Sequence, residues 1–246
     1  MTTNRHPVAT AVTSACAAVT AVAALACSPA GAAATTTVGE WQLDERAGAT
    51  VAQDSSGNGY SASIGSAVTR GIAGASGTAF RFAPPSADVS DPQRLVKVPD
   101  QAGLDPGTRD LHISLWVRTS YADDYNVMQK GQATTAGGFW KVQLDDGYPS
   151  CVLTGVSSSG ARVSAGLTWA TPVDDGAWHH ILCEKLAGSV RLTIDDAAPM
   201  VTWKALGRIS NTWPLVLGGK WSCAPDNGID CDYYRGDLDQ VVLSMG

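Results

Sequence analysis

Hydrophobic and polar residues alternate along most of this chain with a period of two. In Val190–Asp196, the apolar Val190, Leu192 and Ile194 alternate with polar residues, as in a strand with one buried face. The preceding run, Trp178–Leu186, has largely apolar or aromatic residues on both faces, which is typical of a strand between two covered surfaces. A short Ala-Gly-Ser turn joins the two runs. The pattern therefore predicts a β-hairpin within a stack of two sheets.

Comparable short runs recur at intervals of about ten residues and are bounded by Gly, Asp, Asn or Pro. No segment has the periodicity of an amphipathic helix, so the crossover helices of a parallel α/β fold are not expected. The prediction is an all-β protein, a two-sheet antiparallel β-sandwich of the jelly-roll kind. Its other expected strands are Val38–Leu43, Thr78–Phe82, Arg94–Val98, Leu111–Thr119, Asn126–Lys130, Phe139–Leu144, Cys151–Val156, Arg162–Leu167, Met200–Trp203, Pro214–Gly219 and Gly236–Ser244.

The first 34 residues have the pattern of a secretory signal peptide. Arg5 precedes a charge-free run of small apolar residues, and the segment ends in Ala32-Ala33-Ala34, which fits the Ala-x-Ala cleavage pattern. The run is too poor in Leu and lacks the cationic flank of a membrane anchor, so no membrane span is predicted. A lipoprotein signal that ends at Cys27 is the alternative. Residues 35–246 are then expected to form one secreted domain, whose length suits a single sandwich.

Charge narrows the classes of partner. Without Arg5 the 17 cationic side chains become 16, against 23 acidic ones, so the predicted mature chain has a net charge of −7. Nucleic acids and anionic membranes need basic surfaces, and neither is an expected partner. The sequence does not specify an oligomeric state.

Four cysteines remain after the predicted cleavage: Cys151, Cys183, Cys223 and Cys231. An even number in a secreted chain indicates two disulfides, with three possible pairings. We favour Cys223–Cys231, which closes a short acidic loop, and Cys151–Cys183, which would join two neighbouring strands. A zinc site is not expected, because no C-x-x-C pair occurs.

Several short motifs resemble those of the laminin-G-like, concanavalin A-like lectin/glucanase superfamily in its bacterial secreted form. They are WQLDE (41–45), DSSGNG (54–59), FRF (80–82), ISLWVR (113–118), DGAWHH (175–180), LTIDD (192–196), PLVLGG (214–219) and GDLDQV (236–241). The resemblance implies a jelly roll with Trp41, Trp116 and Trp178 packed between its sheets. It leaves function open, because this fold includes lectins, adhesion modules, lyases and glycosidases. Asp195-Asp196 stands where Asp-Gly is usual, so the geometry of that turn is not given by the resemblance.

The sequence contains no recognisable catalytic set. Glycosidases need a pair of carboxyl groups, and the three glutamates, Glu40, Glu45 and Glu184, do not form the E-x-D-x-E strand of the glucanases. Adjacent residues on a strand point to opposite faces, so His179 and His180 are not expected to bind one metal ion. Enzymatic activity is therefore the less favoured reading.

Calcium has a better set of donors. The 54–59 loop offers the side chains of Asp54 and Asn58, and relatives often join such a loop to an aspartate in the last strand, here Asp239. These three residues are the candidate ligands of a structural calcium ion. The alternative is that Asp54 only holds its own Asx-type turn.

Eight tryptophans stand against three phenylalanines, and several lie near strand ends. Sugar-binding surfaces often present aromatic faces beside a few polar groups, and Trp203, Trp221 and Tyr148 are the candidates for such a rim. We therefore expect a secreted, non-catalytic binding module whose partner is an extracellular polysaccharide or glycan. The alternatives are a polysaccharide-active lyase or hydrolase with an unrecognised catalytic set, and a protein-adhesion module.

Overall fold

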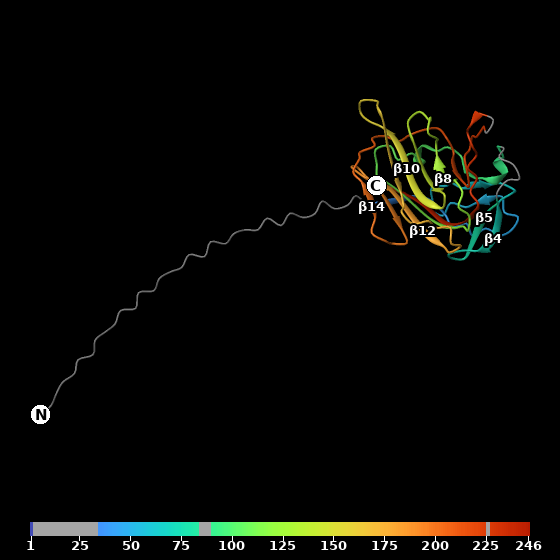
Figure 1. Cartoon of the computed structure of the whole chain (residues 1–246), viewed down its shortest axis with the longest axis horizontal. Coiled ribbons are helices and arrows are strands. Elements are labelled where there is room, and N and C mark those ends of the chain that lie inside the picture. Colours follow the sequence, from blue (N-terminus) through green and yellow to red (C-terminus); the bar gives the residue numbers. More distant parts are fainter. Residues whose placement is uncertain (2–33, 84–89, 225–226) are drawn as a thin grey trace. The chain divides into compact units, whose positions relative to one another are not determined.

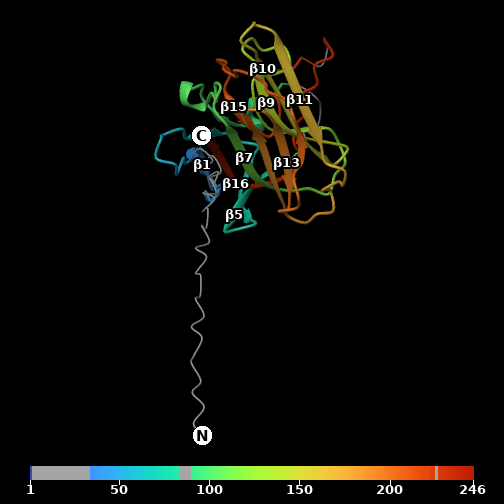
Figure 2. The same cartoon turned by 90° about the vertical axis from the view of Figure 1, so that its left-hand side faces the viewer.

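The described residues of the domain form two antiparallel sheets of eight strands each (Figures 1 and 2). The computed structural model describes Met1 and residues 34–83, 90–224 and 227–246. The predicted leader lies outside these residues except for Met1 and Ala34, and so does Cys27. Among the described residues, no helix has the length and apolar character needed to cross a bilayer. The prediction of an all-β sandwich of jelly-roll type is confirmed.

The first sheet has the order β14-β13-β12-β7-β16-β5-β4, with β1 also paired to β16. Its strands are β14 (Met200–Thr202), β13 (Val190–Ile194), β12 (His179–Lys185), β7 (Leu111–Arg118), β16 (Gly236–Met245), β5 (Thr78–Phe82), β4 (Thr69–Ala73) and β1 (Thr36–Trp41). A bulge lies between Asp239 and Val242 of β16, where Gln240 has a positive φ of 46°. β5 pairs with β16 before this bulge and β1 pairs with it after the bulge.

The second sheet has the order β11-β10-β9-β8-β15-β6-β3-β2. Its strands are β11 (Arg162–Thr168), β10 (Tyr148–Val156), β9 (Phe139–Asp145), β8 (Tyr125–Lys130), β15 (Leu215–Leu217), β6 (Val96–Val98), β3 (Ala62–Ile64) and β2 (Val51–Ala52). Two short 3₁₀ helices, Pro92–Arg94 and Ala102–Leu104, lie in the connections. In Figure 1, β10 and β8 of this sheet lie above β12, β5 and β4 of the first sheet.

Strict alternation positions the core between the sheets. In β7, Leu111, Ile113, Leu115 and Val117 are buried, whereas the residues between them are partly exposed on the outer face. The disulfide Cys151–Cys183 joins β10 of one sheet to β12 of the other inside this core. The disulfide Cys223–Cys231 closes a loop, and Cys231 packs in a second small cluster with Leu95, Val216 and Tyr233. Both favoured cysteine pairings are therefore present.

The tryptophans differ in part from the prediction. Trp41 is buried in the core as expected, and its indole Nε1 donates to the carbonyl of Tyr60. Trp116 and Trp178 are only partly buried, because the core-facing positions of β7 belong to its aliphatic residues and β12 begins after Trp178. Their predicted place between the sheets is wrong. Trp140 is fully buried within β9.

Candidate functional site

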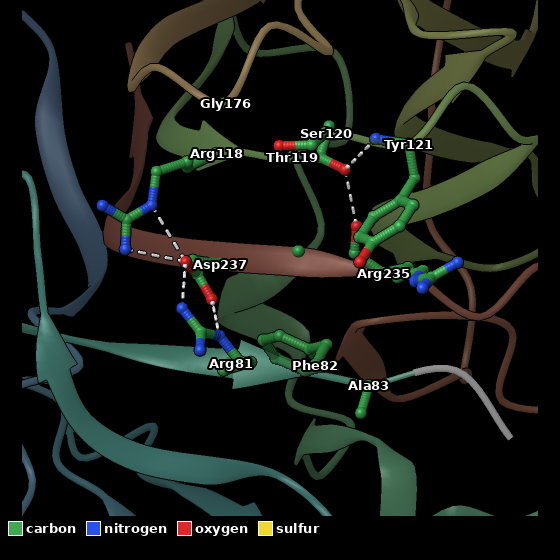
Figure 3. A pocket seen from close by; sticks show the side chains of 11 residues that line it. Arg81, Phe82, Ala83, Arg118, Thr119, Ser120, Tyr121, Gly176, Arg235 and Asp237 are labelled. Carbon is green, nitrogen blue, oxygen red and sulfur yellow. Dashed lines mark hydrogen bonds and ion pairs between the residues drawn. The ribbon is translucent and has the colours of Figure 1, made fainter.

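A cleft of about 460 Å³ opens where β5, β7 and β16 meet at one end of the first sheet (Figure 3). The strand register creates it: Asp237 of β16 lies opposite Arg81 of β5 on one side and opposite Arg118 of β7 on the other. Side chains at directly opposed positions share one face of a sheet, so these three side chains meet. The other lining residues are Phe82, Ala83, Thr119, Ser120, Tyr121, Gly176, Arg235 and Gly236.

One buried carboxylate orients two guanidinium groups. Asp237 has a side chain only 5% exposed, and it accepts hydrogen bonds from Arg81 Nε at 2.7 Å and Nη2 at 3.1 Å. Arg118 approaches the same carboxylate with Nε at 2.9 Å and Nη2 at 2.8 Å (Figure 3). The hydrogen bonds to Asp237 raise the pKa of Arg81. Because one negative charge is shared by two cations, this group of three keeps a net positive charge.

Arg118 is held on two further sides. Its Nη2 donates to the carbonyl of Ala73 at 3.1 Å, and its guanidinium lies 4.6 Å from the ring centroid of Trp178. Stacking on an indole face is favourable for a guanidinium and fixes the plane of the group. The side chain of Arg118 is thus pre-oriented before any ligand binds.

Arg235 supplies the second uncompensated charge. Its guanidinium stacks on Tyr121, 3.1 Å from the ring centroid, and no carboxylate among the described residues pairs with it. Thr119 positions both partners, since its hydroxyl donates to the carbonyl of Arg235 at 2.7 Å and accepts from the backbone N–H of Tyr121 at 3.2 Å. Tyr121 is itself 40% exposed. The cleft therefore combines an aromatic face with a free cation.

This chemistry suits the recognition of an anion. Three arginines against one aspartate give the lining residues a net charge of +2 in a chain whose net charge is −6. Arginine binds carboxylates and other oxyanions through paired N–H groups, and such charge-assisted hydrogen bonds are the strong ones. Among the described lining residues, the one carboxylate is already engaged by two arginines.

The comparisons with known proteins agree with this architecture. A family model described as laminin G domain matches residues 127–244. The binding domain of Paraclostridial Mosquitocidal Protein 1 superposes with a TM-score of 0.59 at 15% identity, covering 85% of this chain and 48% of that one. The binding domain of botulinum neurotoxin serotype G gives 0.59 at 14% identity, covering 84% and 47%.

The chain contains a laminin G-like, concanavalin A-like domain. It spans about half the length of those toxin binding domains, and at this identity the likeness to them concerns the fold. No curated protein matches the sequence.

The three aromatic residues predicted to form a sugar-binding rim lie on different parts of the laminin G-like domain. Trp203 follows β14 and is 79% exposed, whereas Tyr148 begins β10 in the other sheet and is 37% exposed. Trp221 lies beyond β15, with the ammonium of Lys97 4.5 Å from its ring centroid. None of the three lines the arginine cleft. They stay separate candidates, and no contact recorded among the described residues joins them.

Asp54 and Asn58, two of the predicted calcium ligands, connect their loop to β1. The carboxylate of Asp54 accepts backbone hydrogen bonds from Glu40, Ser56 and Tyr60 at 2.8–3.0 Å. Burial raises its pKa, but these hydrogen bonds outweigh that effect and the net shift is downward. Asn58 donates its amide to the carbonyl of Val38 at 2.9 Å. The contact with Ser56 is that of an Asx-type turn, but the contacts with Glu40 and Val38 join the loop to β1, so the turn does not hold only itself.

Asp239, the third predicted ligand, has a different set of neighbours. It is fully buried and accepts from the backbone N–H of Ser76 and of Gln240, both at 2.9 Å. Burial raises its pKa. Its contacts and those of Asp54 share no residue, and no group of three His, Cys, Asp or Glu in the described part of the chain is placed to hold a metal ion. The residues present do not assemble one donor set, and calcium binding stays a prediction.

Sequence reasoning missed the arginine cleft. Arg81 and Arg118 were recorded within the FRF and ISLWVR motifs, and Asp237 within GDLDQV, but as marks of the fold. Strand alternation places each of them on the outer face. The register that brings them together joins segments far apart in the sequence, and alternation within each strand does not specify it.

Proposed function

We propose that this laminin G-like domain is a secreted, non-catalytic binding module that recognises an acidic carbohydrate in the cleft of Arg81, Arg118, Tyr121 and Arg235. The observation that carries the proposal is the pre-oriented pair of arginines around Asp237 beside an arginine that has no acidic partner in the described structure. A volume of about 460 Å³ is within the usual range for small-ligand sites. The toxin domains of similar fold are themselves described as binding domains, which supports a binding role.

An acidic sugar suits the mixture of groups better than a neutral one. The arginine N–H groups can engage a carboxylate, while the hydroxyls of Ser120 and Tyr121 belong to the same lining and can exchange hydrogen bonds with sugar hydroxyls. The exposed part of the Tyr121 ring offers an apolar surface to a sugar ring. A glycan with an isolated uronic acid unit presents this combination.

The described residues include one Ser–His pair of the kind that nucleophilic enzymes use. The hydroxyl of Ser114 lies 2.8 Å from His180 Nε2, and His180 Nδ1 is 4.0 Å from the fully exposed carboxylate of Asp196. Acyl transfer also needs free N–H donors for an oxyanion. Ser114 lies in the middle of β7, which pairs with β12 on one side and with β16 on the other. The backbone N–H groups there are therefore engaged in the hydrogen bonds of the sheet. This surrounding supports a packing role for the pair.

Titration calorimetry with a matched pair of sugars tests the proposal. A trisaccharide with one galacturonic acid unit and two galactose units should bind, whereas the corresponding neutral galactose trimer should not. Arg235→Ala should weaken binding about tenfold or more, because a charge-assisted hydrogen bond contributes about 1.5–3 kcal/mol. Arg46→Ala is the control, since Arg46 is an exposed arginine that does not line the cleft.

Equal binding of both sugars, or an unchanged affinity in Arg235→Ala, would refute the arginine cleft as the site. New reducing ends or unsaturated products after incubation with a panel of polysaccharides would establish the enzyme instead. Retention of a protein from a cell-wall extract, with no glycan bound, would favour the adhesion module.

A further inference from the structure

His179 occupies an unusual position between two acidic side chains. Its Nδ1 lies 2.7 Å from Asp195 Oδ2, and its Nε2 lies 3.0 Å from Asp175 Oδ1. A carboxylate oxygen only accepts hydrogen bonds, so both ring nitrogens must carry a proton for both contacts to be favourable. The geometry therefore requires the imidazolium form. The neutral ring would turn one nitrogen lone pair toward a carboxylate.

The two aspartates belong to segments with different roles. Asp195 begins the turn after β13, where Asp195 and Asp196 have positive φ values of 51° and 57°. Such backbone conformations are costly for residues other than glycine, and the carboxylate of Asp195 stabilises the turn by also accepting from the backbone N–H of His180 at 2.8 Å. Asp175 lies in the loop before β12, next to Gly176.

That loop forms one wall of the arginine cleft. Gly176 lines the cleft (Figure 3). Its backbone N–H donates to the carbonyl of Thr119 at 2.8 Å. Thr119 is the residue that positions Arg235 and Tyr121. His179 thus connects a fixed turn at Asp195 to the cleft wall at Gly176 through Asp175.

We propose that His179 is a positioning residue that makes ligand binding in the arginine cleft dependent on pH, with tight binding while its ring is protonated and weaker binding after the ring loses a proton. This inference depends on the proposed anionic ligand. On deprotonation, the ring keeps its Nδ1 proton and its bond to Asp195, the shorter of the two contacts, and loses the bond to Asp175. The Asp175 side chain is 63% exposed. Without the hydrogen bond from His179, the loop that contains Asp175 and Gly176 loses one of the contacts that hold it in place.

Electrostatic repulsion is also expected to weaken the binding of an anion when the His179 ring loses its proton. The protonated ring with Asp175 and Asp195 carries a net charge of −1, and loss of the proton makes it −2 beside a site for an anion. The other charged or titratable groups on the packed elements are Asp174 of the loop, Asp196 of the turn, His180, Glu184 and Lys185 of β12, His112 and Arg118 of β7, and Arg191 of β13. Burial lowers the pKa of His179, but its hydrogen bonds to Asp195 and Asp175 outweigh that effect and the net shift is upward. The change is therefore expected above pH 6.5.

The first measurement needs no ligand. In nuclear magnetic resonance titrations, the His179 ring and the Gly176 backbone amide should shift with the same midpoint above pH 6.5, and the Gly176 transition should be lost in His179→Gln. A Gly176 amide that does not follow the His179 ring would overturn the coupling, whether or not any sugar binds.

The second measurement follows the affinity for the trisaccharide with one galacturonic acid unit between pH 6 and pH 9. The dissociation constant should rise about twofold to fivefold, as expected for the loss of one partly exposed ion pair. His179→Gln should give a flat profile at the weaker value. His112→Gln is the matched control, because His112 pairs with Glu184 at 2.8 Å without touching the cleft, and it should keep the slope. A flat profile in the unmodified protein, or a slope kept in His179→Gln, would overturn the proposal. Complete absence of binding with intact Gly176 coupling would instead refute the proposed function.

Discussion

The two disulfides should differ in what they contribute to stability. Cys151–Cys183 closes a segment with a sequence separation of 32 and joins the two sheets in the core. Cys223–Cys231 closes a separation of 8 within one surface loop. In the chain-entropy account, a cross-link stabilises the fold by restricting the unfolded chain, and the effect grows with the logarithm of the loop length.

These lengths give about 3.7 kcal/mol for Cys151–Cys183 and about 2.5 kcal/mol for Cys223–Cys231 at 25 °C. The difference of about 1.2 kcal/mol is a lower bound for the paired alanine variants. Both Cys151 and Cys183 are fully buried, so their replacement also removes packed sulfur atoms, whereas Cys223 is partly exposed.

Urea unfolding followed by tryptophan fluorescence checks this order. The variant Cys151→Ala/Cys183→Ala should lose more free energy of unfolding than Cys223→Ala/Cys231→Ala, both measured against the oxidised unmodified protein. The reasoning is refuted if the second variant loses as much as the first. Such a result would mean that the small cluster around Cys231, with Leu95, Val216 and Tyr233, depends on its disulfide more than the main core does.

Three further changes have defined outcomes. Lys130 is fully buried, with Nζ 2.7 Å from Asp100 and 3.0 Å from Asp105. Lys130→Met should therefore lower the free energy of unfolding in urea by about 3–5 kcal/mol. Lys204 is exposed, so Lys204→Met should change this free energy little. Asp237→Asn leaves Arg81 and Arg118 without their shared carboxylate. Because both arginines are partly exposed, we expect the free energy of unfolding to fall by about 1–3 kcal/mol. Calorimetry should also show weaker binding of the acidic trisaccharide. The raised pKa of His179 gives a stabilising contribution that is fully present below pH 6.5 and is lost as pH rises through the folded-state pKa; the melting temperature of the unmodified protein should fall over that range relative to His179→Gln.

The strands could be predicted from alternation because burial between two sheets requires it. The run predicted as Leu111–Thr119 is β7 at Leu111–Arg118, and the run Gly236–Ser244 is β16 at Gly236–Met245. The same alternation places Trp116 opposite to Ile113, Leu115 and Val117. Its position on the outer face is thus consistent with its own strand, and the error came from carrying the packing of the family over to it.

The site could not be predicted in this way, because it depends on pairing between strands. Arg81, Arg118 and Asp237 are each ordinary outward-facing residues in their own segments, and they form a site only in the register of β5, β16 and β7. Exposed aromatic residues such as Trp203 are visible in the sequence as candidates, but nothing in a linear pattern shows that they lie apart. The disulfides are an intermediate case, since only a few pairings of four cysteines exist.

The charge of the whole domain limits which acidic ligands the cleft can accept. Two uncompensated positive charges lie in a chain of net charge −6, so attraction is confined to the cleft while most of the surface repels anions. At physiological ionic strength the Debye length is about 8 Å, which means that the arginines act only on groups that enter the cleft. A densely charged polyanion would place further negative groups against the acidic surface, whereas a glycan with widely spaced acidic units would not. The domain should therefore discriminate by charge spacing, and its preference for the sparsely charged glycan should narrow as added salt screens the surrounding carboxylates.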